Sequence, residues 1–164
     1  MNFRIHEISP ADAVEEAFFR IQQDQMADVP ILNPALRVEA VGFTRWQDHW
    51  LGIVITPWFM NLVLVPGAAE SLQSVAPGLR LFRNFPSGDF AFLGSNEPEV
   101  GEFQSCSLFS PMGQFADQDG AREVALAALE EGIVVGADLA GPQRPVGVGR
   151  LAALFGEGRF FFRG

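Results

Sequence analysis

The sequence predicts a single α+β domain, in which an antiparallel sheet of about five or six strands packs with two main helices. Segments rich in β-branched and aromatic residues follow one another without the intervening helices that a parallel sheet needs. One helical pattern precedes this run of strands and a second follows it. A chain of 164 residues with 48% hydrophobic content is also long enough to bury a sizeable core.

The first helix is predicted to begin after Ser9 and to end near Ala27. Ser9 suits the N-cap position and Pro10 suits the first helical position, where its missing N–H costs nothing. The helix should stop before Val29-Pro30, because a proline disfavours helical backbone in the residue that precedes it. Apolar residues recur between these limits at helical spacing, at Val14, Ala17, Phe18 and Ile21.

Three strands are predicted to follow this helix. Val38–Trp46 and Trp50–Thr56 should form a hairpin around Gln47-Asp48, and Phe59–Val65 should be the third strand. The second strand is apolar on both faces, which predicts an internal position in the sheet. Residues 50–66 carry no charge. A membrane helix is nevertheless disfavoured, because this stretch is short, contains a proline near its middle and is rich in β-branched residues.

The second half of the chain is predicted to add three more strands. A loop or short helix over residues 68–77 leads into a hairpin formed by Leu79–Phe85 and Asp89–Leu93. Ser95–Glu99 is expected to be an acidic turn, and Gly101–Phe109 is the last strand. These segments complete the sheet.

Asp117 is predicted to cap a second helix that continues to about Glu131. Its apolar stripe is expected at Ala121, Val124, Ala125, Ala128 and Leu129. Residues 1–135 should form one globular domain. Residues 136–164 contain seven glycines, two prolines and four arginines, and they are expected to form a flexible C-terminal tail.

The charge of the chain limits its partners. The formal net charge is −9, and all eleven basic residues are arginines. This balance argues against nucleic acid, because phosphate binding needs a basic surface. It suits a basic partner such as an arginine-bearing peptide, although solubility is the simpler explanation. The N-terminus lacks the apolar core of a secretory signal, so a cytoplasmic location is expected.

Few residues are suited to catalysis. Cys106 is the single cysteine, which excludes an internal disulfide and a CxxC metal site. It could be a nucleophile with His49 as its base, but its apolar, strand-like setting favours a buried and inert thiol. His6 is expected in a flexible terminus and His49 in a solvated turn beside Asp48, with no spacing typical of a metal site. The sequence therefore predicts neither an enzyme nor a bound metal or cofactor.

Several long motifs of the chain are similar to those of a known family. They include MADVPILNPAL at 26–36, VEAVGF at 38–43, TPWFMNLVL at 56–64 and CSLFSPM at 106–112, which Phe115 follows. Together they resemble the HybE/HupJ family of [NiFe]-hydrogenase accessory proteins, also called hydrogenase assembly chaperones, over about residues 10–135. Some members resemble a fusion with a rubredoxin domain. This chain lacks the four cysteines of that domain, so the resemblance implies no iron or electron-transfer role.

The resemblance implies a non-catalytic role in hydrogenase maturation. Such proteins are thought to hold hydrogenase subunit precursors in the cytoplasm and to delay export until cofactors are in place. The implied partner is the small-subunit precursor, which bears a twin-arginine signal peptide, with the large subunit as a second candidate. No nucleic acid and no membrane insertion are implied.

An apolar groove with an acidic rim would complement a twin-arginine signal, which has a basic end and a moderately apolar stretch. Pro57 and Pro111 each follow a predicted strand, so both loops are expected at the same end of the sheet. The groove residues are expected to be Trp58, Phe59, Met60, Phe109, Met112 and Phe115. The alternative is that these six side chains are ordinary core. The acidic rim is expected at Glu97, Glu99, Glu102, Asp117 and Asp119.

Cys106 leaves two alternative functions open. In one, the chain is a small enzyme built on this thiol. In the other, it is a redox accessory factor whose thiol senses oxygen or handles the iron–sulfur chemistry of the subunit. Both alternatives require a thiol that reagents can reach.

Overall fold

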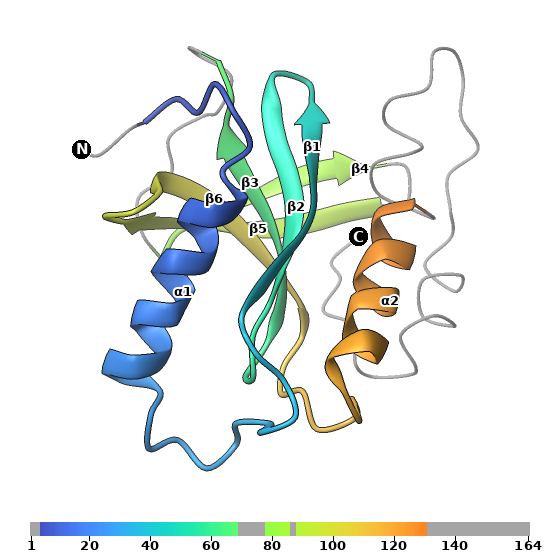
Figure 1. Cartoon of the computed structure of the whole chain (residues 1–164). Coiled ribbons are helices and arrows are strands. Elements are labelled where there is room, and N and C mark those ends of the chain that lie inside the picture. The colour runs from blue at the N-terminus through green and yellow to red at the C-terminus, as the bar shows by residue number, and fades with distance from the viewer. Residues whose placement is uncertain (1–3, 69–77, 86–87, 131–164) are drawn as a thin grey trace.

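A computed structural model describes residues 4–68, 78–85 and 88–130 of the chain (Figure 1). Within these residues, six antiparallel strands form one sheet in the order β1-β2-β3-β6-β5-β4. Two helices accompany the sheet, so the predicted α+β fold is confirmed. The elements are α1 (Ala11–Gln25), β1 (Glu39–Trp46), β2 (His49–Ile55), β3 (Met60–Pro66), β4 (Arg80–Phe85), β5 (Gly88–Glu97), β6 (Gly101–Phe109) and α2 (Gln118–Ala128).

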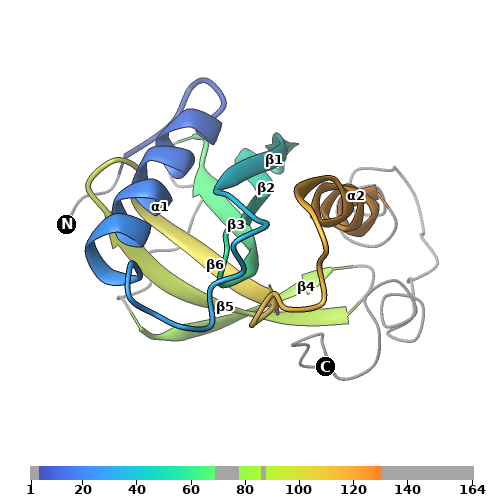
Figure 2. The same ribbon diagram turned by 60° about the horizontal axis from the view of Figure 1, so that its bottom comes forward.

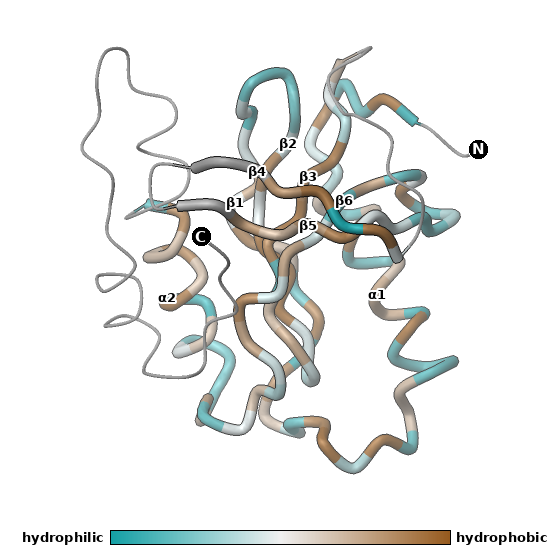
Figure 3. Tube along the Cα trace, turned by 180° about the vertical axis from the view of Figure 1, so that it is seen from behind, coloured by the Kyte–Doolittle hydropathy of each residue, from teal (hydrophilic) through white to brown (hydrophobic). Residues whose placement is uncertain are grey.

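The two helices cover opposite faces of the sheet and flank β1, which is an edge strand (Figures 1 and 2). Successive side chains of a strand point to opposite faces, so the apolar strands supply a core to each helix. The α2 core contains Leu51, Ile53, Met60, Leu62, Phe90, Phe92, Ala121 and Ala125, among others. The α1 core contains Val14, Ala17, Phe18, Val54, Trp58, Val63, Val65 and Phe103. Figure 3 shows hydrophobic residues concentrated along the central strands.

The β1–β2 hairpin forms where the sequence predicts it. Gln47 and Asp48 both have positive φ, at 50° and 65°, as a two-residue hairpin turn requires. His49, however, does not lie in a solvated turn. It is the first residue of β2 and is only 5% exposed, because the tight turn ends at Asp48 and the strand begins directly after it.

The β5 strand is longer than predicted. Ser95 was expected to begin an acidic turn, but β5 continues to Glu97, which pairs with Gly101 at the start of β6. The reversal is confined to Pro98–Val100, where the Val100 N–H donates to the Glu97 carbonyl at 3.1 Å. Pairing with β6 explains the difference, since each additional β5 residue gains a partner on the neighbouring strand.

The segment before α1 is tied to the sheet, in contrast to the flexible terminus expected around His6. The His6 N–H donates to the Pro66 carbonyl at 3.0 Å, and its Nε2 lies 2.8 Å from the Val100 carbonyl. The indole N–H of Trp50 donates to the His6 carbonyl at 2.8 Å, and Arg4 donates to the Glu99 carbonyl at 2.7 Å. These bonds hold the segment against the ends of β2 and β3 and against the β5–β6 turn.

Of the two predicted helix caps, the one at α2 is confirmed and the one at α1 is wrong by one residue. The Ser9 hydroxyl accepts the Ala11 N–H at 3.3 Å, although Pro10 occupies the N-cap position and not the first turn. The Asp117 carboxylate accepts the Gly120 N–H at 2.8 Å and caps α2 as predicted. The predicted tail at 136–164 and most of the predicted 68–77 loop lie outside the described residues. No helix of the described part has the length and apolar character needed to span a membrane.

Candidate functional site

Three segments that are far apart in the sequence meet at one end of the sheet, and Asn33 holds them together. Its backbone N–H donates to the Pro57 carbonyl at 2.9 Å. Its side-chain amide donates to the carbonyls of Met112 and Phe115, at 2.9 and 2.8 Å. Its Oδ1 accepts the Ala35 N–H at 2.9 Å. Because one asparagine satisfies backbone groups in all three segments, their positions are fixed relative to one another.

These segments, which we call the junction loops, are residues 30–36, 56–59 and 110–116. The prediction that two of them share one end of the sheet is confirmed. Met60, at the start of β3, pairs with Phe109, at the end of β6, so the loop before β3 lies beside the loop after β6. The junction loops thus bring parts of three of the sequence motifs together.

Thr56 shapes the second junction loop. Its Oγ1 lies 3.2 Å from the Trp58 N–H and 2.9 Å from the Phe59 N–H, and it accepts from both. Its own N–H donates to the Phe59 carbonyl at 2.9 Å. This turn directs both aromatic rings towards Phe18 of α1, with ring centroids 6.5 Å away for Trp58 and 5.6 Å away for Phe59. The turn therefore packs against the first helix.

The structure does not form one open groove from the six predicted side chains. Four of them belong to the core and are at most 7% exposed, namely Trp58, Met60, Phe109 and Met112. Phe59 and Phe115 are half-buried at the edges of the two cores. The alternative assignment to the core therefore holds for four of the six residues, and only Phe59 and Phe115 have surface to offer a partner.

The sheet itself separates these side chains. Met60 and Phe109 face α2, and Phe115 packs edge-on against Phe109 at 5.2 Å between ring centroids. Trp58 and Phe59 lie in the α1 core on the other face. A sequence pattern places these residues in neighbouring loops, but the face to which each points depends on the strand register.

The exposed surface of the junction loops is largely uncharged. Ile31 is 53% exposed, which is high for an isoleucine. The other exposed residues of these loops are Pro30, Pro34, Ala35, Ser110, Pro111, Gly113, Gln114 and Ala116. Asp117 and Asp119 follow immediately in the chain, and both are exposed. This end of the molecule therefore offers an uncharged surface that is bordered by Asp117 and Asp119, of which Asp119 is paired with Arg122, and by the exposed Arg37.

The predicted acidic rim divides into two separate places. Asp117 and Asp119 adjoin the junction loops, whereas Glu97, Glu99 and Glu102 lie around the β5–β6 turn. Strand β6 separates the two groups, with a length of about 27 Å at the usual rise per residue. Glu102 is only 5% exposed and offers little surface. Five carboxylates therefore cannot border one site.

Arg20 of α1 forms ion pairs with carboxylates at the β5–β6 turn. Its guanidinium donates to both Glu97 and Glu99, and the Nε–Oε2 distance to Glu99 is 2.7 Å. The hydrogen bond from Arg20 lowers the pKa of Glu99 below its ordinary value. These two glutamates therefore hold α1 against the turn.

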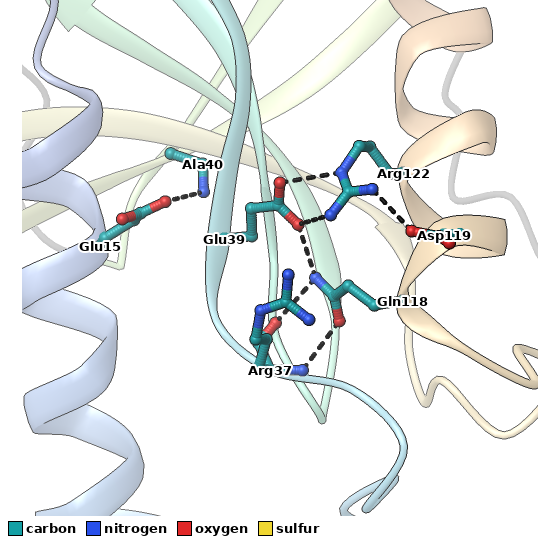
Figure 4. A network of polar contacts seen from close by, with 7 residues as sticks. All are labelled: Glu15, Arg37, Glu39, Ala40, Gln118, Asp119 and Arg122. Atoms are coloured by element: carbon teal, nitrogen blue, oxygen red, sulfur yellow. Dashed lines mark hydrogen bonds and ion pairs between the residues drawn. The ribbon is translucent and has the colours of Figure 1, made fainter.

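A polar network joins β1 to α2 beside the junction loops (Figure 4). Arg122 donates to the two carboxylate oxygens of Glu39, at 2.9 and 3.0 Å, and to Asp119 at 2.7 Å. Gln118 donates to Glu39 at 2.8 Å. Burial alone would raise the pKa of Glu39, but the hydrogen bonds from Arg122 and Gln118 outweigh it, and the net pKa is lowered. Glu39 is therefore held as a carboxylate.

Cys106 is not placed for catalysis or redox sensing. The residue is 3% exposed, and burial raises the pKa of its thiol to about 12. His49 is not beside it. Cys106 pairs with Leu62, whereas His49 pairs with Pro66, about 13 Å further along β3. Nor does any group of three potential metal ligands gather among the residues described.

The polar residues that organise this region carry little recognisable signal in the sequence. The sequence predicts no role for the side chains of Asn33, Glu15, Glu39 and Gln118. Their partners lie up to 83 residues away in the chain. No local spacing indicates such contacts. The asparagine and proline within the MADVPILNPAL motif are the one available signal, since Asn-Pro favours a turn.

Three comparisons with known proteins lead to one family. Residues 9–157 match the family described as "[NiFe]-hydrogenase assembly, chaperone, HybE". The chain is 43% identical over 139 residues to Protein HoxT of Cupriavidus necator, covering 78% of each chain. It is 45% identical over 120 residues to the hydrogenase expression/formation protein HupJ of Bradyrhizobium diazoefficiens, covering 73% of this chain and 69% of that protein. The solution structure of HybE from Escherichia coli matches with a TM-score of 0.65 at 26% identity, covering 87% of this chain and 91% of that one.

Proposed function

This chain belongs to the HybE family of [NiFe]-hydrogenase assembly chaperones, and from this premise we propose that it acts in the cytoplasm by binding a hydrogenase subunit precursor before export. The proposed partner is the small-subunit precursor, with its twin-arginine signal peptide. The role is non-catalytic. Binding would delay export until the cofactors are in place and the subunits have met.

The observation that carries this proposal is the convergence of the family motifs at the junction loops. Parts of MADVPILNPAL, TPWFMNLVL and CSLFSPM meet there, and Asn33 links all three. Ile31, Phe59 and Phe115 leave apolar surface at this end of the sheet. Apolar side chains on loops can contact partner segments of different sequence, because apolar contacts do not require particular hydrogen-bonding groups.

Charge supports an arginine-bearing partner. The net charge of −9 attracts a basic segment and speeds its encounter with the chain. Asp117 and Asp119 place two exposed carboxylates beside the junction loops. Contacts with exposed carboxylates are screened by salt, so they would govern association more than the lifetime of the complex. The apolar surface would govern the lifetime.

The test is capture of the purified small-subunit precursor by this protein, with one variant on the junction loops and a matched variant elsewhere. Ile31→Ser removes an exposed apolar side chain of the junction loops. Ile8→Ser removes one that is 80% exposed, close to the opposite end of the sheet. We expect Ile31→Ser to weaken capture and Ile8→Ser to leave it unchanged.

The precursor supplies the second part of this test. Replacing its paired arginines with glutamines, or raising the salt concentration, should weaken capture. Failure of the wild-type protein to capture the precursor would refute the proposed partner. Equal capture by Ile31→Ser and Ile8→Ser would instead leave the partner in place and refute the junction loops as its binding site.

A further inference from the structure

The free edge of β1 is covered by side chains from both helices in place of a neighbouring strand (Figure 4). The Arg37 N–H, just before β1, donates to the Gln118 Oε1 at 2.9 Å, and the Gln118 Nε2 donates back to the Arg37 carbonyl at 3.3 Å. On the α1 side, the Ala40 N–H donates to the Glu15 carboxylate at 2.8 Å. An adjacent strand would satisfy the same backbone groups.

These contacts imitate strand pairing. The amide of Gln118 offers one donor and one acceptor to a single residue, as the backbone of a paired strand does. In an antiparallel strand, the N–H and C=O of one residue point to the same side. The Ala40 N–H bonds to Glu15, so Ala40, which lies opposite Val54 of β2, occupies a ladder position whose N–H and C=O face the free edge. Within β1 the free edge therefore offers the backbone groups of Ala40, and Arg37, before the strand begins, offers its own groups on the α2 side.

The two helices supply apolar side chains on either side of this edge. Phe19 of α1 is 44% exposed and lies one helical turn from Glu15, on the same side of the helix. Leu126 of α2 is 41% exposed, and its side chain lies 3.6 Å from the position of a Cβ on Gly42. A segment lying along β1 would therefore meet an apolar side chain from each helix.

A carboxylate, that of Glu15, faces the Ala40 position of this edge, while the exposed Arg37 lies at the end where β1 begins. Glu15 forms no ion pair within the described residues, since its described contact is with the backbone of Ala40. If an incoming backbone took over the Ala40 N–H, the Glu15 carboxylate would be released beside the segment. A carboxylate at that place favours an arginine in the partner.

We propose that an extended, arginine-bearing segment of the bound precursor adds to β1 as an extra strand, displacing the side chains of Gln118 and Glu15. This inference rests on the proposed function and specifies how the partner is bound. Backbone hydrogen bonds would supply affinity without demanding a particular sequence. Glu15 is half-buried and can leave by rotation about its own side-chain bonds, whereas release of Gln118, which is 6% exposed, also costs its hydrogen bond to Glu39.

The register of β1 limits the length of the added strand. The β1–β2 pairing shifts between Val41 and Thr44, and Gly42 within this interval has a φ of 68°. Such a bulge bends the strand and interrupts a regular edge. The added strand would therefore be short, and the junction loops next to its Arg37 end would hold the adjoining part of the partner.

The first test removes the outward donor without disturbing the β1–β2 ladder. Ala40→Pro eliminates the N–H that faces the free edge, and edge strands accept proline at such positions. Ala40→Ser keeps the N–H and is the matched control. Using the full-length chain and the purified small-subunit precursor, we expect affinity to fall at least tenfold for Ala40→Pro and to stay at the wild-type level for Ala40→Ser.

The second test has the opposite sign and does not depend on proline. Gln118→Ala removes a side chain that the partner must displace, so the precursor should bind several-fold more tightly. Amide exchange of Ala40 in the wild-type chain should also slow when the precursor binds.

The outcomes separate the two proposals. If the wild-type chain captures no precursor, the proposed function fails. If it captures the precursor but Ala40→Pro binds equally well, strand addition fails and the proposed function stands. If Ala40→Pro does not fold, as circular dichroism would show, Gln118→Ala decides. Unchanged or weaker binding by that variant, with unchanged exchange at Ala40 in the wild-type chain, overturns strand addition.

Discussion

Arg122 donates two hydrogen bonds to Glu39, at 2.9 and 3.0 Å, and thereby joins the first turns of α2 to the edge strand β1. The two residues are 83 positions apart in the sequence. Two-point contact between a guanidinium and a carboxylate fixes orientation as well as distance. The pair therefore sets the position of α2 relative to the sheet edge and the junction loops.

The pair makes stability depend on pH in the acid range. Burial opposes ionisation of Glu39, but the hydrogen bonds from Arg122 and Gln118 lower its pKa in the folded chain. The stabilisation is therefore present above the unfolded pKa of about 4.3 and is lost as pH falls through the lowered folded value. Urea unfolding between pH 6 and pH 3 should show a shallower decline for Glu39→Gln than for the wild type. Glu123→Gln, which changes an exposed carboxylate of α2, should retain the wild-type slope.

The Asn33 side chain should contribute measurably to stability, because its amide satisfies two carbonyls of the junction loop at 110–116. Asn33→Ala removes the described donor of the Phe115 carbonyl and leaves the Met112 carbonyl with the Phe115 N–H at 3.2 Å, so it should reduce the free energy of unfolding by about 2–3 kcal/mol. Asn96→Ala, at an exposed position on β5, should change it by less than about 0.5 kcal/mol. Equal stability of the two variants would contradict the role assigned to Asn33. Chemical denaturation measures both.

Met112 should behave as a core residue and not as a binding residue. It has no exposed surface, so Met112→Ala should leave a cavity and destabilise the fold by about 2–5 kcal/mol. Gln114→Ala, at an exposed position two residues away, should be close to neutral. A Met112→Ala variant with wild-type stability and reduced precursor capture would contradict the core assignment and support the binding role that the sequence predicts for Met112.

Cys106 should be unreactive in the folded chain. A thiol that is 3% exposed, with a pKa raised to about 12, is almost entirely protonated at pH 8. Alkylation by iodoacetamide should be more than about a hundredfold slower in the native protein than in guanidinium chloride. Rapid native alkylation, or failed hydrogenase maturation by a stably folded Cys106→Ser variant, would revive an enzymatic or redox role.

The sequence predicts the elements of this fold well because most of their signals are local. Continuous uncharged runs rich in β-branched residues mark β2 and β3, and the paired turn residues Gln47 and Asp48 locate the first hairpin. The bounds of β6 agree with the structure at both ends. The extension of β5 to Glu97 was missed, because it depends on pairing with β6 and not on the composition of residues 95–97.

The candidate site was predicted less well, because its geometry is non-local. The sequence correctly places the Pro57 and Pro111 loops at one end of the sheet, but it cannot show that Trp58 and Met112 face opposite helices. That difference follows from the strand register. The rim prediction fails for a similar reason, since Glu97 and Asp117 are separated by the length of β6.

The bonds made by His6 limit the order in which contacts can form while the chain is being synthesised. Its Nε2 contact with the Val100 carbonyl spans 94 positions of the chain, so it cannot form until the ribosome has released the turn between β5 and β6. The bonds of His6 to Pro66 and Trp50 need only the first three strands, so this segment can lie over the ends of β2 and β3 before its contact with Val100 forms.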